Sequence, residues 1–445
     1  MVLATTLSLL ALQADLPRRG ALGAQFAQLS DEAITAANLE PGTSGIVVTG
    51  VVPGLTAEKA GLKPSDVITK INDRPAKAQG LGEWVRTIPA GSEMTFTVIR
   101  DRKPMTLKHR LVERPRDPGN ANYTVTYSSV DTTCGRMRTI ITTPKKPGKY
   151  PAILFIQGFS PVSYDFTLEG SKGDVTSLDG PILYHFASSN FVLMRVEKPG
   201  VGDSEGGPFA NLDFKSEIDI YRQAMKQMID MTLVDKRNVF IFGHSMGGSF
   251  GPMIANEFPV RGLAVYGTAG RTWFEYLMDT IRYQGLVAGQ SFEGADEEAR
   301  IGAKVMSQVM LLKKSPEEVK KSSPELAQFV DAYFPGGLFN GKTLEFWRQL
   351  NEINFATYWA KCGSHVLAVR GASDFVTYDA DHKLIADIIN SVNPGYGKFE
   401  VLPNSDHLFH NFATEKESMA KFQFGQCNPA FGKLVTDWIE TVKVR

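Results

Sequence analysis

Cysteine is scarce in this chain of 445 residues, which contains only Cys134, Cys362 and Cys427. The three form no CxxC pair and no cluster with histidine, so a structural zinc site is not expected. Two interpretations stay open for them. They are three mostly buried thiols, or Cys362 and Cys427 form a disulfide in an exported protein. We expect the thiols.

An excess of charge of either sign is also absent. The 48 Lys and Arg residues balance the 48 Asp and Glu residues, which gives a formal net charge of zero. Such a balance gives no electrostatic reason to expect nucleic acid or an anionic membrane as a partner.

Long apolar runs are missing after the first residues of the chain. The first fourteen residues are apolar and end in Ala14, as in a signal peptide, but no Lys or Arg precedes them. Residues 1–16 are therefore expected to be either a signal peptide of a periplasmic or secreted protein, or an apolar N-terminal arm of a cytoplasmic one. No later run approaches the ~20 residues that a membrane span needs, so no transmembrane span is expected.

Residues 17–114 differ in pattern from the rest, and the chain is too long for a single core. Short β-type runs at Ile46–Thr49 and Met94–Ile99 flank a segment that contains a small helix, a Gly turn and a Ser-Asp turn. This pattern predicts a small mixed α+β domain. It contains no visible catalytic set.

Several motifs of this domain resemble a PDZ domain of the kind attached to bacterial HtrA proteases. They are Ala57–Leu62, Ser65–Ile68 and Ile71–Pro75. The upstream Arg19–Ala24 segment resembles the carboxylate-binding loop of that family. The resemblance implies that a peptide or a protein C-terminus adds as a strand, its carboxylate held by backbone N–H groups of Leu22, Gly23 and Ala24. The alternative is a domain used only for packing or dimer contacts.

Residues 123–445 show the pattern of a parallel sheet, after a polar stretch at 115–122 that predicts a linker. Two β-type runs come first, and then short apolar runs alternate with longer amphipathic ones. The apolar runs include Ala152–Ile156, Phe191–Arg195, Val239–Phe242, Leu263–Tyr266, Val366–Val369 and Phe399–Leu402. Continuous apolar strands that alternate with helices predict an α/β domain whose mostly parallel sheet is covered on both faces.

The alternation stops between about residues 270 and 362. This segment is rich in residues with helical spacing, as in Ala295–Leu312 and Ser315–Tyr333, and is far longer than one crossover helix. We expect a helical cap inserted over the carboxyl edge of the sheet. A separate domain is less consistent with the sequence, because the sheet resumes at Val366.

The strongest chemical motif is Gly-x-Ser-x-Gly around Ser245, between an apolar strand and a helix. A nucleophile needs such a sharp turn to expose its hydroxyl, and Gly243 and Gly247 leave room for the strand and the helix to approach. The helix N-terminus favours a developing negative charge. Ser245 is therefore the predicted nucleophile.

This layout resembles the α/β-hydrolase family, in which the acid and the histidine follow the serine on later loops. Asp374 follows the strand at Val366–Val369, and His407 follows the next strand. They are the predicted acid and base. His410 stays open as a competing base, and Asp379 and Asp381 stay open as competing acids.

The resemblance also implies an oxyanion hole made by the N–H of Met246 and that of Phe159. Gln157 stands where many relatives have His, which leaves the backbone role intact. The Gly-rich segment Glu197–Ser204 is interpreted as structural. No metal or organic cofactor is expected.

Three classes of function are compatible with these residues. The first is hydrolysis of a carboxylic ester through an acyl-enzyme, and the second is a peptidase of the prolyl-oligopeptidase or iminopeptidase kind. An aminopeptidase would need cap carboxylates to hold the substrate amine, and the candidates are Glu293, Asp296, Glu297 and Glu298. The third class, a non-enzymatic adaptor, is disfavoured by the complete Ser, Asp and His set. We expect an esterase acting on a small or medium acyl ester.

Overall fold

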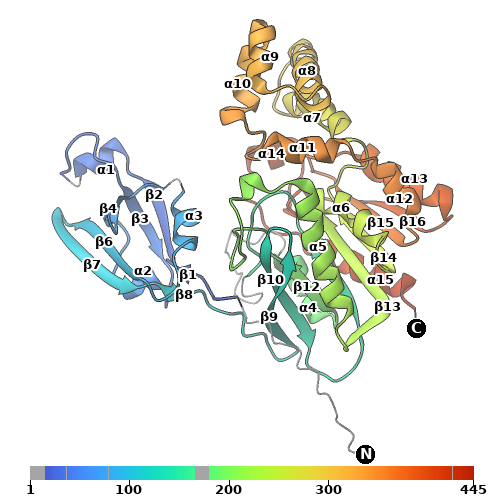
Figure 1. Cartoon of the computed structure of the whole chain (residues 1–445), viewed down its shortest axis with the longest axis horizontal. Helices are drawn as coiled ribbons and strands as arrows, with labels where there is room; N and C mark the ends of the chain where they lie inside the picture. Colours follow the sequence, from blue (N-terminus) through green and yellow to red (C-terminus); the bar gives the residue numbers. More distant parts are fainter. Residues whose placement is uncertain (1–15, 37, 79, 166–179, 423, 445) are drawn as a thin grey trace, which may run out of the picture. The chain divides into compact units, whose positions relative to one another are not determined.

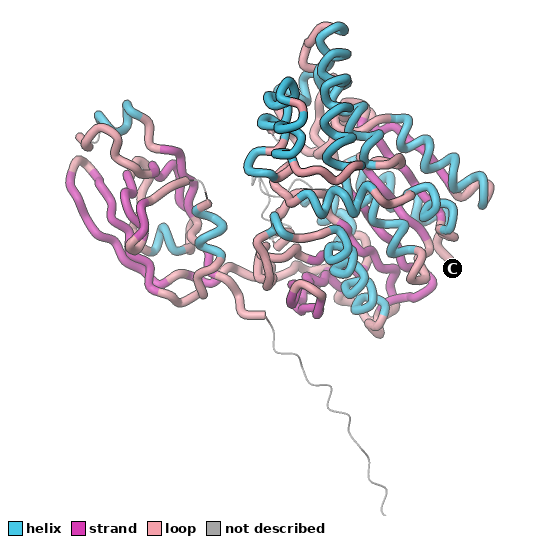
Figure 2. The backbone as a smooth tube through the Cα atoms, turned by 45° about the horizontal axis from the view of Figure 1, so that its top comes forward, coloured by secondary structure: helices cyan, strands magenta, loops and turns pink. Residues whose placement is uncertain are grey.

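The computed structural model describes residues 16–36, 38–78, 80–165, 180–422 and 424–444. Of the expected signal peptide or arm at 1–16, all but Leu16 lies outside the described residues. The chain divides into two compact units, Pro17–Arg116 and Asp117–Arg445, and Leu16 belongs to the second. The division falls within the stretch 115–122 that was predicted as a linker. Figure 1 labels the elements of both units, and Figure 2 shows that strands dominate the first.

The first unit is the small mixed α+β domain that the sequence predicts. Its strands are β1 (Gly20–Ala21), β2 (Ala24–Gln28), β3 (Ile46–Val51), β4 (Val67–Ile71), β5 (Arg74–Pro75), β6 (Glu93–Arg100), β7 (Lys103–Arg110) and β8 (Val112–Glu113). The main sheet is antiparallel in the order β2-β3-β4-β6-β7, β5 pairs with β4, and β1 pairs with β8. Its helices are α1 (Asp31–Ala36), α2 (Thr56–Lys59) and α3 (Leu81–Arg86). Strand β2 forms one edge of this sheet.

The second unit contains an eight-stranded sheet in the order β16-β15-β14-β13-β11-β12-β10-β9. Its strands are β9 (Tyr123–Thr132), β10 (Gly135–Pro144), β11 (Tyr150–Ile156), β12 (Val192–Val196), β13 (Val234–His244), β14 (Gly262–Tyr266), β15 (His365–Gly371) and β16 (Gly397–Leu402). Strand β10 is antiparallel to both of its neighbours, and the other pairs are parallel. The mostly parallel sheet of the predicted α/β-hydrolase fold is confirmed.

Helices cover both faces of this sheet, because its strands are apolar on both sides. One hydrophobic cluster joins the sheet to α5 (Phe214–Ile229), α6 (Met246–Ala255) and α13 (Asp379–Val392). The other joins it to α4 (Gly180–Ser188) and α15 (Ala430–Val442). Neighbouring strand residues alternate between the two clusters, as a pleated strand requires.

The expected helical cap is inserted between β14 and β15. It consists of α7 (Trp273–Val287), α8 (Phe292–Met306), a π-helical turn η2 (Ser307–Leu311), α9 (Pro316–Ser322), α10 (Ala327–Tyr333), α11 (Leu344–Asn351) and α12 (Phe355–Lys361). The segment Ser315–Tyr333, expected to be helical throughout, is interrupted at Ser323, which leaves the α-region just before Pro324. Figure 1 shows α7–α11 gathered at one end of the strands.

The three cysteines are thiols in the structure, and Cys362 and Cys427 are not joined. In the parts of the chain described above, the structure contains no helix long and apolar enough to cross a membrane.

Candidate active site

Ser245 occupies the turn between β13 and α6, in a backbone conformation that side chains rarely adopt. Its φ and ψ are 54° and −128°. A Cβ at Gly247 would lie 2.1 Å from the carbonyl oxygen of Ile156, and one at Gly243 would lie 2.7 Å from that of Gly247. The two glycines therefore permit the close approach that holds this strained turn and presents the serine at the helix N-terminus.

The structure brings Ser245, His407 and Asp374 together from three loops. His407 Nε2 lies 3.0 Å from Ser245 Oγ, and His407 Nδ1 lies 3.0 Å from Asp374 Oδ2. The loops follow β13, β15 and β16, whose parallel register places their carboxyl ends at one edge of the sheet. A serine, an imidazole and a carboxylate in this order can pass a proton from the hydroxyl to the ring.

Asp374 is fully buried and held in one orientation. Its Oδ1 accepts hydrogen bonds from the N–H groups of Val376 and Thr377, at 2.7 and 3.1 Å, and its Oδ2 accepts one from the Thr377 hydroxyl at 2.6 Å. Burial opposes ionisation of this carboxyl, but the charge of His407 and the hydrogen bonds from His407 and Thr377 outweigh it. Together they lower the pKa of Asp374 to about 2.

The competing acids and base have other neighbours. Asp379 pairs with Arg370, and Asp381 accepts hydrogen bonds from the Gly270 N–H and from Arg271. His410 Nδ1 lies 3.9 Å from Asp406 Oδ2. The histidine before Ser245 in sequence, His244, has its Nε2 2.8 Å from the carbonyl oxygen of His407, so it holds the backbone of that loop.

The two residues expected to supply oxyanion donors both lie beside Ser245. Met246 and Phe159 line the same cavity as the serine. A Cβ at Gly158 would lie 3.0 Å from Ser245 Cβ, so the loop that carries Phe159 passes directly over the serine. Gln157 points away to β12, where its amide donates to the carbonyl oxygen of Val196 at 2.9 Å.

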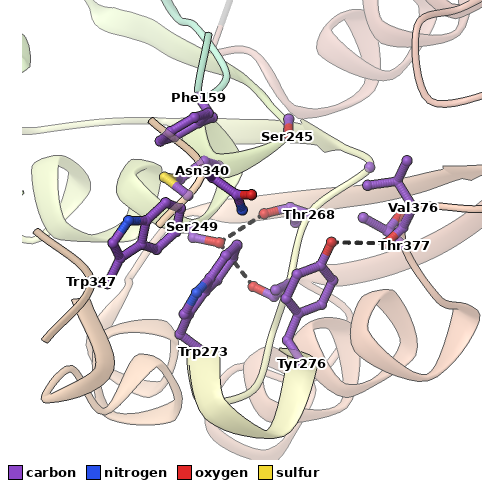
Figure 3. Close-up of a pocket in the computed structure, with 13 residues that line it drawn as sticks. Phe159, Ser245, Ser249, Thr268, Trp273, Tyr276, Asn340, Trp347, Val376 and Thr377 are labelled. Carbon is purple, nitrogen blue, oxygen red and sulfur yellow. Dashed lines mark hydrogen bonds between the residues drawn. The ribbon is translucent and has the colours of Figure 1, made fainter. Parts of the chain in front are cut away.

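A cavity of about 150 Å³ opens beside Ser245, between the sheet and the cap (Figure 3). Aromatic rings form much of its wall: Phe159, Trp273, Tyr276 and Trp347. Trp273 stacks on Trp347 with ring centroids 5.1 Å apart, and Phe159 contacts Trp347 at 5.2 Å. Ser249, Thr268, Asn340 and Thr377 supply its polar groups, and none of the described residues that line it carries a formal charge.

The cap residues Trp273, Tyr276 and Trp347 were not identified from the sequence, because aromatic side chains at helical spacing are as typical of a core as of a pocket. The acidic cap candidates do not line this cavity. Asp296 instead pairs with Arg282 and Arg300, and Glu298 accepts a hydrogen bond from the Tyr333 hydroxyl. The described residues contain no group of three or more His, Cys, Asp or Glu side chains arranged to hold a metal ion.

In the first unit, Leu22, Gly23 and Ala24 lie at the start of the edge strand β2. The carbonyl oxygens of Leu22 and Gly23 accept hydrogen bonds from the N–H groups of Ala57 and Val52, both at 2.8 Å. Gly23 has a φ of 69°, and a Cβ there would lie 2.3 Å from the Leu55 Cβ. The loop is thus fixed beside an edge that another strand can extend.

Comparison with protein families matches residues 20–111 to the PDZ domain. The periplasmic serine endoprotease DegP of Escherichia coli K12 is 35% identical over 95 residues, which are 21% of this chain and 20% of DegP. A probable CtpA-like serine protease of Staphylococcus aureus is 35% identical over 74 residues, 16% of this chain and 15% of that protein. The chain thus spans about a fifth or less of the length of these curated relatives.

Among solved structures, a complex of DcsB with its substrate analogue has a TM-score of 0.45 at 16% identity, covering 72% of this chain and 99% of that one. Est1E from Butyrivibrio proteoclasticus with bound ferulic acid has a TM-score of 0.44 at 14% identity, covering 71% and 98%. Both scores are below 0.5, so the fold is assigned from its own strand order, its serine turn and its inserted cap. Residues 20–111 of this chain are a PDZ domain, and the unit that follows has the α/β-hydrolase fold.

Proposed function

We propose that this protein is a serine hydrolase that cleaves carboxylic esters through an acyl-enzyme on Ser245. The observation that carries the proposal is the chain of contacts from Ser245 Oγ to His407 Nε2 and from His407 Nδ1 to the buried Asp374, each 3.0 Å long. Asp374 orients the ring and stabilises its protonated form, so that Nε2 can act as a base toward the serine.

The proposed reaction has two halves. His407 takes the proton of Ser245 as the oxygen attacks the ester carbonyl, and the Met246 and Phe159 N–H groups stabilise the oxyanion. The intermediate collapses, and His407 gives the proton to the departing alcohol. A water molecule, deprotonated by His407, then attacks the acyl-enzyme, and the acid leaves as Ser245 regains its proton.

The cavity favours an ester over the substrate of an aminopeptidase. The amine of an aminopeptidase substrate is cationic and needs a carboxylate partner, whereas the described residues that line this cavity include several aromatic rings and no formal charge. About 150 Å³ is close to the space that a benzene ring fills. We therefore propose a neutral acyl group that is short or that carries a single ring.

The PDZ domain is proposed to bind a peptide or a protein C-terminus as an added strand at the edge of β2, with the carboxylate at Leu22, Gly23 and Ala24. The apolar start of the sequence supports export, and the relatives of the PDZ domain include an enzyme named as periplasmic. We therefore propose a periplasmic or secreted location.

A fluorophosphonate probe tests the nucleophile. The wild-type chain and Ser391→Ala, which changes an exposed serine on α13, should be labelled, and Ser245→Ala should not. A folded wild-type protein without labelling would disprove the hydrolase proposal. Turnover of nitrophenyl esters from acetate to octanoate, with benzoate, compared with aminoacyl-naphthylamides then separates esterase from peptidase. Faster cleavage of the amides would reverse the assignment.

A further inference from the structure

Three charged side chains from different parts of the second unit meet in its interior. Lys198 follows β12, Glu217 lies in α5, and Lys342 lies in the cap just before α11. Lys198 Nζ is 2.6 Å from Glu217 Oε1, Lys342 Nζ is 2.9 Å from Glu217 Oε2, and no side chain of the three is more than 1% exposed. Well-packed apolar residues would stabilise a fold as well as such a cluster, so stability alone does not account for it.

Lys198 also holds the loop over the serine. Its ammonium donates to the carbonyl oxygens of Gly158 and Phe159, at 2.6 and 3.0 Å. The Gly158 carbonyl and the Phe159 N–H belong to one planar peptide unit and point in opposite directions. Fixing the carbonyl on Lys198 therefore fixes the direction of the N–H group that is proposed to meet the oxyanion.

The charges of Lys198, Glu217 and Lys342 also favour an oxyanion at this N–H group. Two ammonium groups and one carboxylate leave a net positive charge behind this peptide unit, in an interior where charges are weakly screened. Burial lowers the pKa of Lys198 and lowers that of Lys342 to about 8, while the charge of Glu217 opposes both shifts. Burial raises the pKa of Glu217, but the charges of Lys198 and Lys342 outweigh it and lower that pKa.

Lys342 connects this cluster to the cap. Its ammonium lies over the rings of Phe346, Phe209 and Phe159, at 3.7, 4.3 and 5.6 Å from their centroids. Phe159 is also the residue that faces the cavity and carries the proposed oxyanion donor. The carboxylate of Glu217 thus pairs both with Lys198, which holds the loop over the serine, and with Lys342, which packs against rings of the cap and of that loop.

We propose that Lys198 is a positioning residue of the oxyanion hole, and that Glu217 and Lys342 complete a buried ion network that ties the oxyanion loop to the cap. This inference rests on the proposed function. The network acts on the transition state, in which the oxyanion is present, and much less on binding of the neutral ester.

The test compares Lys198→Met and Lys198→Arg with the wild-type chain. Lys198→Met should lower kcat by about 10- to 100-fold with KM changed by no more than about threefold. This is less than the roughly 100- to 1,000-fold cost of removing an oxyanion donor, because the N–H group itself remains. It should weaken a trifluoromethyl ketone, which forms an oxyanion on the serine, by a similar factor, and leave affinity for the neutral alcohol product unchanged. Lys198→Arg keeps the charge and the donors, so it should recover most of both losses.

Arg138→Met is the matched control, because Arg138 forms another fully buried ion pair, with Asp203 at 3.2 Å. It should lower the melting temperature and leave kcat and ketone affinity of the folded protein near wild type. Wild-type kcat and ketone affinity in folded Lys198→Met would overturn the inference. If that variant does not fold, Lys342→Met is measured instead, and no loss of ketone affinity there would overturn it too. Absence of labelling in the wild-type chain itself would refute only the proposed function.

Discussion

Gly267 lies directly against His407: a Cβ on this glycine would be 2.9 Å from Nδ1 of the imidazole and 3.1 Å from Asp374 Oδ2. The glycine follows β14 and has a φ of 59°. The backbone just after β14 thus packs directly against the Asp374–His407 pair and leaves no room for a side chain at Gly267.

Gly267→Ala is expected to separate this pair and to lower kcat/KM by about 100-fold, as displacements of about 1 Å do at a catalytic site. Gly289→Ala is the matched control, because Gly289 also has a positive φ, 97°, with nothing within 4 Å of its added Cβ. Both variants bear a backbone strain of roughly 1–2 kcal/mol. Ester hydrolysis and thermal melting of the two proteins check the prediction, and equal activities would contradict it.

The free energy of unfolding should depend on pH through the ionisation of Asp374. Its pKa is lowered from 3.8 to about 2 in the folded protein, so the folded state favours the ionised form. The contribution, about 2 kcal/mol at 1.36 kcal/mol per unit, is present above pH 4 and is lost as the pH falls through about 2. Urea unfolding between pH 6 and pH 2 measures it. Asp374→Asn should lose less stability over this range, and a parallel pH dependence in both proteins would contradict the assignment.

The size of the cavity should set the acyl preference. Trp273→Ala removes one ring of the stack with Trp347 and opens the wall toward the cap. Each newly buried methylene adds about 0.8 kcal/mol, so the ratio of kcat/KM for octanoate to that for butyrate should rise by about tenfold or more. Trp84→Ala, which removes a ring from the PDZ domain instead, should leave this ratio unchanged. An unchanged ratio in Trp273→Ala would place the acyl group elsewhere.

Peptide binding to the PDZ domain should depend on Gly23. Gly23→Ala introduces a Cβ 2.3 Å from the Leu55 Cβ and disturbs the loop before β2, whereas Gly91→Ala adds one to a glycine of similar φ with nothing within 4 Å. In the full chain, binding of labelled peptides with free apolar C-termini should weaken about tenfold or more only in Gly23→Ala. Amidated peptides should bind weakly to every form. Equal binding of free and amidated peptides would contradict carboxylate recognition.

The elements with a strong periodic pattern could be predicted from the sequence. Apolar runs placed the strands β11 to β16, and the order of Ser245, Asp374 and His407 along the chain matches the loops that the structure brings together. These signals are local, because each depends on a strand and the turn that follows it.

The remainder of the site depends on contacts between distant segments. Lys198 was interpreted as part of a structural loop, and nothing near it in sequence indicates Glu217 or Lys342 as a partner. Trp273 and Trp347 carry ordinary core spacing, and only the packed cap shows that their rings face a cavity. The break before Pro324 could have been predicted from the proline, since it restricts the preceding residue.

The insertion of the cap between β14 and β15 also has a consequence for the nascent chain. Ser245 and His407 are 162 residues apart, and the whole cap is translated between them. At roughly 5–20 residues per second, the ribosome needs about 8 to 30 seconds to travel from the serine codon to the histidine codon. During that interval the emerging polypeptide has the proposed nucleophile without its proposed base, so the proposed activity can arise only once the last strands have joined the sheet.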